Sequence, residues 1–366
     1  MNDINEMNLP SDIALVRELS LLFGPSGFEH EVAEFIEEKI SSVCDSFVHD
    51  KMGNLICLIR CGNKDAEERI RVMLSAHMDE VGVMITEICD DGLLRFDTVG
   101  GINVSVLEGR KMTLGNENGT LSGLVASKAI HHINRNDRDK ANKIEKLYID
   151  IGAANREEAE KHLSVGDFGA FDSEFYLFGE KLEYMKGKAL DDRMGCAALI
   201  ETMRAVYENR PDADLDLYFC FTVREEIGLS GAKVAANKIR PDLAIVLEST
   251  AIADLPEVAP SKRVADVGCG GAISVADRAT IYNRDFVEFA MNTGKECSIP
   301  VQLKRYVSGG NDAGSIHKSG TGVRTLALSV PTRYLHSPSC VASISDYRAV
   351  RDLVEAMIRR IDGENP

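Results

Sequence analysis

The sequence predicts an α/β protein in which a mixed-sheet domain is interrupted by a smaller β-rich module. At 366 residues the chain exceeds the usual size of a single core, so a main domain with a second, smaller one is expected. Helical patterns and buried-strand patterns alternate in the first and last parts of the chain, as in α/β sheet domains. Between about residue 86 and residue 178 the sequence pattern changes to short segments of alternating polar and apolar residues with many glycines. We therefore expect residues 1–85 and 179–366 to form the main domain and residues 86–178 to form an inserted β-barrel.

The first 85 residues predict two helices and two strands. Residues 11–23 carry apolar residues at helical spacing and are followed by a Gly-Pro-Ser-Gly turn. Ser26 and Glu29 match a capping box, which predicts that the second helix opens there and continues through 31–43. Two segments dense in branched apolar residues predict strands buried on both faces: 54–60 and 70–77.

The pattern of helices and buried strands returns after the inserted module. The module itself contains one brief helical pattern, at 155–163. A helical segment lies within 184–206, and another covers 344–361. Three apolar runs between them predict further strands of the main sheet: 215–223, 243–250 and 325–330.

The composition argues against two classes of partner. Asp and Glu number 58 against 42 for Lys and Arg, and the formal net charge of -16 repels both phosphate backbones and anionic lipid surfaces. We therefore expect no nucleic-acid partner and no membrane partner. The nine cysteines include no C-x-x-C pair, and the N-terminus has acidic residues where a signal peptide needs basic ones. Both features predict a cytoplasmic protein.

Polar side chains occur at five places at the ends of predicted elements of the main domain. In open α/β sheets ligands gather outside the carboxyl ends of the strands, so these residues are considered together. They are His77 with Asp79, Asp191 with Asp192, Glu225 with Glu226, Glu248, and His336. Two histidines and three carboxylates from this group suit a pair of divalent metal ions such as zinc, cobalt or manganese.

One assignment of these residues completes a binuclear metal site. A carboxylate must bridge the two ions, and each ion needs its own histidine and carboxylate, with an open position left for water. We assign the bridge to Asp191. His77 and Glu248 then bind one ion with it, while Glu226 and His336 bind the other. Two ions held in this way polarise a carbonyl and lower the pKa of a shared water, which is the chemistry of binuclear hydrolases.

The two adjacent glutamates after the strand at 215–223 can have different roles. Neighbouring side chains at the end of a strand point in different directions. We assign Glu226 as a metal ligand and Glu225 as the general base that faces the attacking water. Asp79 is assigned to accept the second N–H of the His77 ring, which fixes the tautomer of that ring.

Each of these signals is weak when it is taken alone. A histidine after a strand is more often an ordinary surface or core residue than a ligand. Asp191 and Asp192 fit a helix N-cap with an acidic first turn, the pair at 225–226 fits a solvated charge cluster, and Glu248 fits another cap. The metal site is favoured because all five places lie at ends of elements in one predicted domain and together complete a ligand set.

Five motifs then point to one family, since they occur in its order and with comparable gaps. They are SAHMDEVGVMI, GKALDDRMGC, FTVREEIGLSGA, SGGNDAGSIH and PTRYLHSPS. With these motifs the chain resembles the glutamyl and deblocking aminopeptidases known as tetrahedral (TET) peptidases, whose relatives include proteins labelled cellulase M. The resemblance covers nearly the whole chain. It implies a binuclear zinc-exopeptidase fold of the phosphorylase/hydrolase-like type, with an eight-stranded mixed sheet between helices, and an inserted PDZ-like β-barrel that mediates dimerisation.

The resemblance also carries expectations about assembly and about individual residues. Six dimers are expected to form a hollow tetrahedral dodecamer. The same ligands, base and orienting aspartate are implied, together with a cis peptide bond between Asp191 and Asp192. The chain departs from the family pattern at Glu248, where many members have Asp, and at Asn311, where Thr is more usual.

The expected function is that of a metal-dependent aminopeptidase acting on short peptides through a water activated by two ions, zinc or cobalt, with manganese as a further choice. A related deacylase or carboxypeptidase would use the same ions, and substrates with a blocked N-terminus or a free C-terminus separate these activities. A glycosidase, which the cellulase label suggests, needs two carboxyls and no metal, so inhibition by a chelator argues against it. A catalytically silent binding protein is disfavoured because ligands and base are all present.

Overall fold

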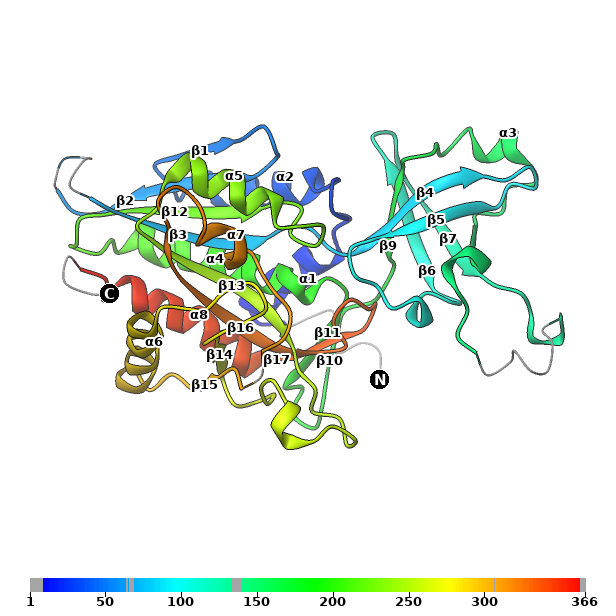
Figure 1. The fold of residues 1–366 in the computed structure, drawn as a ribbon. Helices are drawn as coiled ribbons and strands as arrows, with labels where there is room; N and C mark the ends of the chain where they lie inside the picture. The colour runs from blue at the N-terminus through cyan, green and yellow to red at the C-terminus, as the bar shows by residue number, and fades with distance from the viewer. Residues whose placement is uncertain (1–8, 64, 66–68, 133–139, 306, 363–366) are drawn as a thin grey trace.

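The computed structural model describes residues 9–63, 65, 69–132, 140–305 and 307–362. Figure 1 shows a large sheet with helices on both sides and a small barrel beside it. The predicted α/β architecture with a separate β-barrel is therefore confirmed. Within the described ranges, no helix combines the length and the apolar character needed to cross a bilayer.

The large sheet contains 11 strands among the described residues, not the eight that the resemblance implied. Its strands are β1 (Ser46–His49), β2 (Leu55–Arg60), β3 (Ile70–His77), β10 (Tyr176–Phe178), β11 (Tyr184–Gly187), β12 (Leu215–Thr222), β13 (Leu243–Ala251), β14 (Gly271–Ile273), β15 (Val301–Leu303), β16 (Arg324–Arg333) and β17 (Cys340–Ser343). Nine of them lie in the order β1-β2-β12-β3-β13-β16-β17-β11-β10, while β14 pairs with β15 and β16. Several of the additional strands are only three or four residues long, too short to give a clear period in the sequence.

The centre of the sheet is parallel and fully covered. β12 and β13 flank β3, and β16 lies beside β13, all in the same direction. Nearly every residue of these four strands is buried, which confirms the prediction of strands covered on both faces. Because parallel strands end at the same edge of a sheet, the segments that follow His77, Thr222 and Arg333 emerge close together.

Helices cover both sides of this sheet (Figure 1). They are α1 (Ser11–Leu21), α2 (His30–Ile40), α4 (Leu190–Glu208), α5 (Ser230–Ile239), α6 (Arg284–Glu296), α7 (Ala313–Ile316) and α8 (Ile344–Ile358). The long helix α4 packs on β3 and β13 and contacts α1 and α8. Asp191, in its first turn, contacts His77 at the end of β3. Fourteen of its 19 residues are buried, as expected for a helix enclosed by other helices and a sheet.

The predicted capping box at the start of the second helix is wrong. α2 begins at His30, and Glu29 occupies the N-cap position without capping the helix through its side chain. Ser26 Oγ instead donates a hydrogen bond to Asp79 Oδ2 over 2.5 Å. Glu29 Oε1 accepts hydrogen bonds from the backbone N–H groups of Gly27 and Arg224. Ser26 and Glu29 therefore bind partners that are distant in sequence, although the spacing of these two residues matches a local helix cap.

The barrel is closed by six antiparallel strands. They are β4 (Gly82–Ile88), β5 (Leu94–Val99), β6 (Lys111–Asn116), β7 (Gly119–Ala126), β8 (Tyr148–Asp150) and β9 (Phe168–Phe171). Its own hydrophobic core includes Val83, Phe96 and Leu114, and the brief helix predicted in this region is α3 (Arg156–Ala159). The strands cover residues 82–171, and the predicted domain limits at 86 and 178 stay a prediction.

Candidate metal centre

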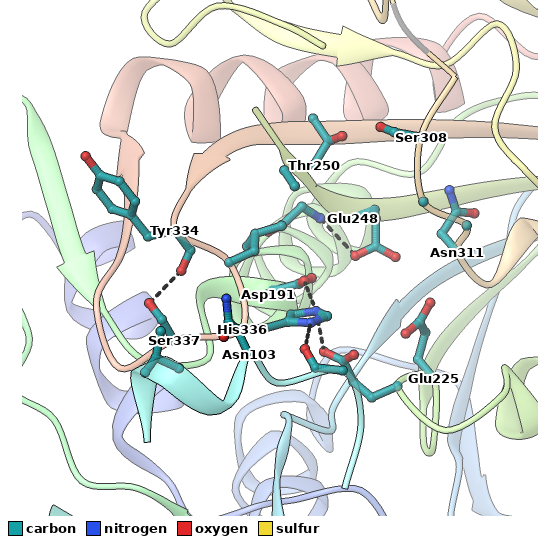
Figure 2. Close-up of a pocket in the computed structure, with 18 of the residues that line it drawn as sticks. Asn103, Asp191, Glu225, Glu248, Thr250, Ser308, Asn311, Tyr334, His336 and Ser337 are labelled. Atoms are coloured by element: carbon teal, nitrogen blue, oxygen red, sulfur yellow. Dashed lines mark hydrogen bonds and ion pairs between the residues drawn. The ribbon is translucent and has the colours of Figure 1, made fainter. Parts of the chain in front are cut away.

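The predicted site residues come from five different elements, and the parallel sheet brings them to one place. His77 is the last residue of β3, Glu225 and Glu226 follow β12, Glu248 lies in β13, Asp191 lies in the first turn of α4, and His336 follows β16. A cavity of about 740 Å³ opens beside them. Figure 2 shows Asp191, Glu225, Glu248 and His336 among the residues that line it.

Asp191 lies between the two histidines. Its Oδ1 is 3.3 Å from His77 Nε2, and its Oδ2 is 3.6 Å from His336 Nε2. A second carboxylate faces the same nitrogen of each imidazole: Glu248 Oε1 is 3.5 Å from His77 Nε2, and Glu226 Oε1 is 3.2 Å from His336 Nε2. The arrangement therefore has two halves that share one carboxylate.

The donor atoms are close enough to hold metal ions. Three groups of three residues each have one ligand atom apiece within 4.8 Å of one another: His77 with Asp192 and Glu248, His77 with Glu225 and Glu226, and Asp191 with Glu226 and His336. Glu248 Oε2 and Asp192 Oδ2 are buried and have no hydrogen-bond partner among the described residues. A buried carboxylate oxygen without a partner is costly, and a cation would satisfy it. The residues present thus fit divalent metal ions.

Asp192, which the sequence-based assignment left outside the ligand set, also lies close to His77 and Glu248. Its Oδ1 accepts a hydrogen bond from the backbone N–H of Gly195 over 3.1 Å, so one oxygen supports the first turn of α4. The peptide bond between Asp191 and Asp192 is cis, as the resemblance implied.

Burial and mutual charge shift the ionisation of the whole cluster. Burial raises the pKa of both Glu225 and Glu248 well above 4.5. Burial opposes charge on His336, but its hydrogen bonds with Asp191 and Glu226 outweigh this and raise its pKa to about 11. Burial also opposes charge on Asp191, yet hydrogen bonds from the two histidines hold its pKa below its usual value. In the absence of metal, protons on the imidazoles and on the buried carboxyls therefore offset the negative charge of the site. A metal ion has to displace these protons in order to bind.

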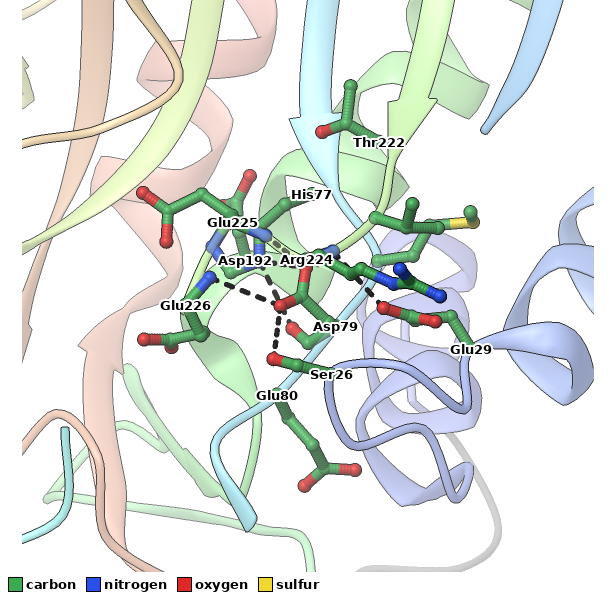
Figure 3. Close-up of polar contacts among 12 residues, drawn as sticks. Ser26, Glu29, His77, Asp79, Glu80, Asp192, Thr222, Arg224, Glu225 and Glu226 are labelled. Atoms are coloured by element: carbon green, nitrogen blue, oxygen red, sulfur yellow. Dashed lines mark hydrogen bonds and ion pairs between the residues drawn. The ribbon is translucent and has the colours of Figure 1, made fainter. Parts of the chain in front are cut away.

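Asp79 contacts both the first histidine and the two glutamates (Figure 3). His77 Nδ1 lies 3.0 Å from the carbonyl oxygen of Asp79 and 3.4 Å from its Oδ1, so both are in place to accept the ring N–H. The Asp79 carboxylate also accepts the backbone N–H groups of Glu225, over 3.0 Å, and Glu226, over 3.2 Å. The second set of contacts was not predicted, because nothing in the spacing of these residues reveals it.

The barrel contributes to the same site. His336 has a left-handed backbone with φ of 58°, and its Nδ1 lies 2.7 Å from the carbonyl oxygen of Gly101, which follows β5. Gly101 and Asn103 also line the cavity. The sequence-based reasoning missed these residues, since they carry no ionisable group and belong to the other part of the fold.

The two residues that depart from the family pattern both border the cavity. Glu248 is 7% exposed and Asn311 is 3% exposed. Asn311 Oδ1 accepts the backbone N–H of Ala313, and its Nδ2 donates to the hydroxyl oxygen of Tyr282 over 3.2 Å. Asn311 is therefore held by its neighbours, and its polar contacts are accounted for within the protein.

Comparison of this chain with known proteins shows the family to which it belongs. The sequence profile described as M42 glutamyl aminopeptidase matches residues 53–353, which is most of the chain. The chain belongs to the M42 family. A putative aminopeptidase of Acetivibrio thermocellus is 38% identical to this M42 chain over 346 residues, covering 94% of this chain and 97% of the relative.

Solved structures agree with this membership. The crystal structure of a TET aminopeptidase from the marine sediment archaeon Thaumarchaeota archaeon SCGC AB-539-E09 matches with a TM-score of 0.91 at 34% identity, covering 97% of each chain. Pyrococcus horikoshii TET1 peptidase, which can assemble into a tetrahedron or a large octahedral shell, matches with a TM-score of 0.85 at 32% identity, covering 96% of this chain and 100% of that one. This M42 protein is a metal-dependent aminopeptidase, and its family implies the use of divalent metal.

Proposed function

We propose that this aminopeptidase removes residues from the free N-terminus of short peptides by means of two divalent metal ions that share Asp191. The position of Asp191 between His77 and His336 carries the proposal, since each of its oxygens faces a different imidazole. In this proposal His77 and Glu248 complete the first metal site. Glu226 and His336 complete the second.

The chemistry follows from the residues that surround these sites. Divalent ions held by these residues would supply Lewis acidity to the scissile carbonyl and would lower the pKa of a bound water. Glu225 lines the cavity but is not needed for either ligand set, so its carboxylate is placed to accept the proton of the attacking water. The same carboxylate then delivers that proton to the leaving amine. Asp79 holds the His77 ring in one tautomer throughout.

The proposed metal centre favours a substrate with a free amino terminus. Asp191, Glu226 and Glu248 line the cavity and would hold the ions there. A free α-amino nitrogen has a lone pair that a divalent ion can bind, whereas the lone pair of an acylated nitrogen is delocalised into its carbonyl group. We therefore favour aminopeptidase activity over the deacylase alternative for this site. Zinc or cobalt, and then manganese, suit its mixed nitrogen and oxygen donors.

We also propose that the barrel mediates dimerisation and that six dimers assemble into a tetrahedral dodecamer in the cytoplasm. Structural similarity over nearly the whole chain to a peptidase that forms a tetrahedron supports this assembly. The barrel supports it as well, because it has its own core and stands to one side of the sheet domain (Figure 1).

The Glu225→Gln variant tests the proposed roles. We expect its turnover of aminoacyl chromogenic substrates to fall by about 10²- to 10⁴-fold, since the general base is lost. Its metal content should equal that of the parent protein, while Glu226→Gln should lose metal. Loss of metal in Glu225→Gln would show that the roles of the two glutamates are exchanged.

The same substrates, assayed after chelation and after adding back zinc, cobalt or manganese, test the metal requirement. Activity should disappear with the chelator and return with at least one of the ions. N-acetylated versions of the substrates should remain uncleaved. Cleavage of the acetylated substrates at the parent rate would favour the deacylase instead.

A further inference from the structure

The short turn after β12 carries two side chains of the proposed mechanism, Glu225 and Glu226. β12 ends at Thr222, so the backbone beyond it no longer has a neighbouring strand to accept its N–H groups. The turn nevertheless has to keep the two glutamates directed toward the cavity. Its amide hydrogen bonds therefore decide where both side chains lie.

Four consecutive amides of this turn are accepted by side chains from other parts of the chain. The N–H of Val223 is accepted by Asn54 Oδ1 over 3.0 Å, and that of Arg224 by Glu29 Oε1 over 3.1 Å. The next two N–H groups, at residues 225 and 226, are accepted by the two carboxylate oxygens of Asp79. Figure 3 shows Glu29 and Asp79 next to one another beneath this turn.

Arg224 is the residue at which the turn changes direction. Its φ is 56°, a left-handed conformation that residues with a side chain seldom adopt. Such a conformation persists where the surroundings hold it in place. Two hydrogen bonds act directly on this residue's backbone: its N–H donates to Glu29 Oε1, and its carbonyl oxygen accepts the N–H of Ser230 over 3.3 Å. The bond to Glu29 is the one of the two that a side chain supplies.

Glu29 is itself held firmly. It is 6% exposed, and its Oε1 also accepts the N–H of Gly27 over 2.8 Å. Ser26, in the same loop, donates to Asp79. The loop that precedes α2 thus supports Glu29 and Asp79, two of the three side chains that accept the amides of the turn, although it contributes no side chain to the cavity lining among the described residues.

We propose that Glu29 is a positioning residue of the aminopeptidase reaction: its side-chain oxygen holds the main chain at Arg224 so that Glu225 and Glu226 reach the reacting groups. The inference rests on the roles of Glu225 and Glu226 proposed above. Glu29 touches neither substrate nor metal in this account, and it acts through the backbone.

Two variants of similar size isolate the hydrogen bond. Glu29→Gln and Glu29→Met both remove the charge, but only the glutamine keeps an oxygen that can accept the Arg224 N–H. We expect Glu29→Met to lower kcat by about 10- to 100-fold, the range found when residues that support a metal site are changed. Its KM should stay within about twofold of the parent value, because the groups that bind substrate remain. Glu29→Gln should keep most of the parent kcat.

The controls separate positioning from general damage. Glu34→Gln changes an exposed glutamate of α2 and should leave kcat unchanged. Metal content of the Glu29→Met protein should match that of Glu29→Gln, and the two should unfold at similar temperatures. Parent-like kcat in Glu29→Met, or equal loss of kcat in both Glu29 variants, would overturn the proposal.

Hydrogen–deuterium exchange tests the inference without any substitution. The amides at residues 223–226 of the parent protein should exchange slowly, since all four are hydrogen-bonded to side chains. Fast exchange of this segment would overturn the proposal even if Glu29→Met failed to fold. If Glu225→Gln retained full turnover, the proposed function would fail instead, so the two failures are distinguishable.

Discussion

Asp191 shows how a single carboxylate can organise two groups of ligands. Its two oxygens face His77 and His336, and these imidazoles balance its charge when no other cation does so. The raised pKa values of both histidines have the same origin, because the carboxylates close to each ring favour the imidazolium. Metal binding therefore has to release protons from the site, and the apparent metal affinity should fall as the pH is lowered.

Replacing His336 tests the second half of the site. We expect His336→Ala to bind fewer metal ions per chain than the parent, because Glu226 and Asp191 lose the nitrogen donor they share. Metal content measured by mass spectrometry after dialysis gives the stoichiometry. His317→Ala is the matched control, since His317 directly follows α7 and its ring contacts the carbonyl oxygen of Ala313, the first residue of that helix. An unchanged metal count in His336→Ala would remove this residue from the ligand set.

At the scale of secondary structure, contacts between helices fix the orientation of the layers that carry the site. Asp12 in α1 accepts hydrogen bonds from the Arg348 guanidinium in α8, over 2.6 and 3.1 Å. Burial opposes charge on Asp12, but the hydrogen bond and the charge of Arg348 outweigh it and lower the pKa below 3.8. This pair joins two helices that both pack against α4.

The lowered pKa of Asp12 predicts a stability difference that depends on pH. A carboxyl whose folded-state pKa is depressed stabilises the fold above its unfolded pKa and loses that effect as the pH falls through the folded value. Asp12→Asn should therefore lower the free energy of unfolding by roughly 1 to 2 kcal/mol at pH 7, allowing for the partial exposure of Arg348. The difference should shrink below about pH 4.

Urea unfolding of parent and variant across this pH range measures the effect. Asp352→Asn is a suitable control, because the Asp352 side chain is 47% exposed and its ion pair with Arg351 should contribute little. A constant difference between parent and Asp12→Asn down to pH 3 would contradict the assignment.

The elements at the centre of the fold could be predicted from the sequence, whereas the contacts between distant elements could not. β3, β12, β13 and β16 are each at least eight residues long and have mostly apolar centres, so they stand out in the sequence as apolar runs. Short strands such as β14 exist because neighbouring strands pair with them, and three residues show no period.

The same distinction holds within the site. The proposed ligands are ionisable residues at the ends of predicted strands or helices. Ligands commonly bind at the carboxyl ends of the strands of such a sheet, so these residues could be selected from the sequence. Glu29 matched a local helix cap, yet its oxygen binds the backbone 195 residues further along. Gly101 has no side chain to suggest any role. Such contacts follow from tertiary packing, which local spacing does not encode.

At the scale of the whole molecule, the barrel and the sheet domain meet at the cavity. Residues of the segment after β5, Gly101 and Asn103, line it together with residues of the sheet domain. Phe28, in the loop before α2, also packs against Phe168 of β9, with ring centroids 5.7 Å apart. The two parts therefore contact one another through both a polar and an aromatic interface.

Removing the barrel should change the size of the assembly. We expect deletion of the barrel strands, residues 82–171, to convert the parent particle into smaller species, because the proposed dimer contact is lost. Size-exclusion chromatography with light scattering measures the mass, and circular dichroism checks that the sheet domain has folded. A deletion variant that keeps the mass expected for twelve subunits would contradict the role of the barrel.

The hydrogen bond between His336 and Gly101 bears on how a newly made chain matures. During synthesis the barrel emerges from the ribosome before β16 and the segment after it that carries His336. The contact between the imidazole and Gly101 can form only after both parts have folded and docked. A nascent polypeptide would consequently lack this contact until its last strands are made.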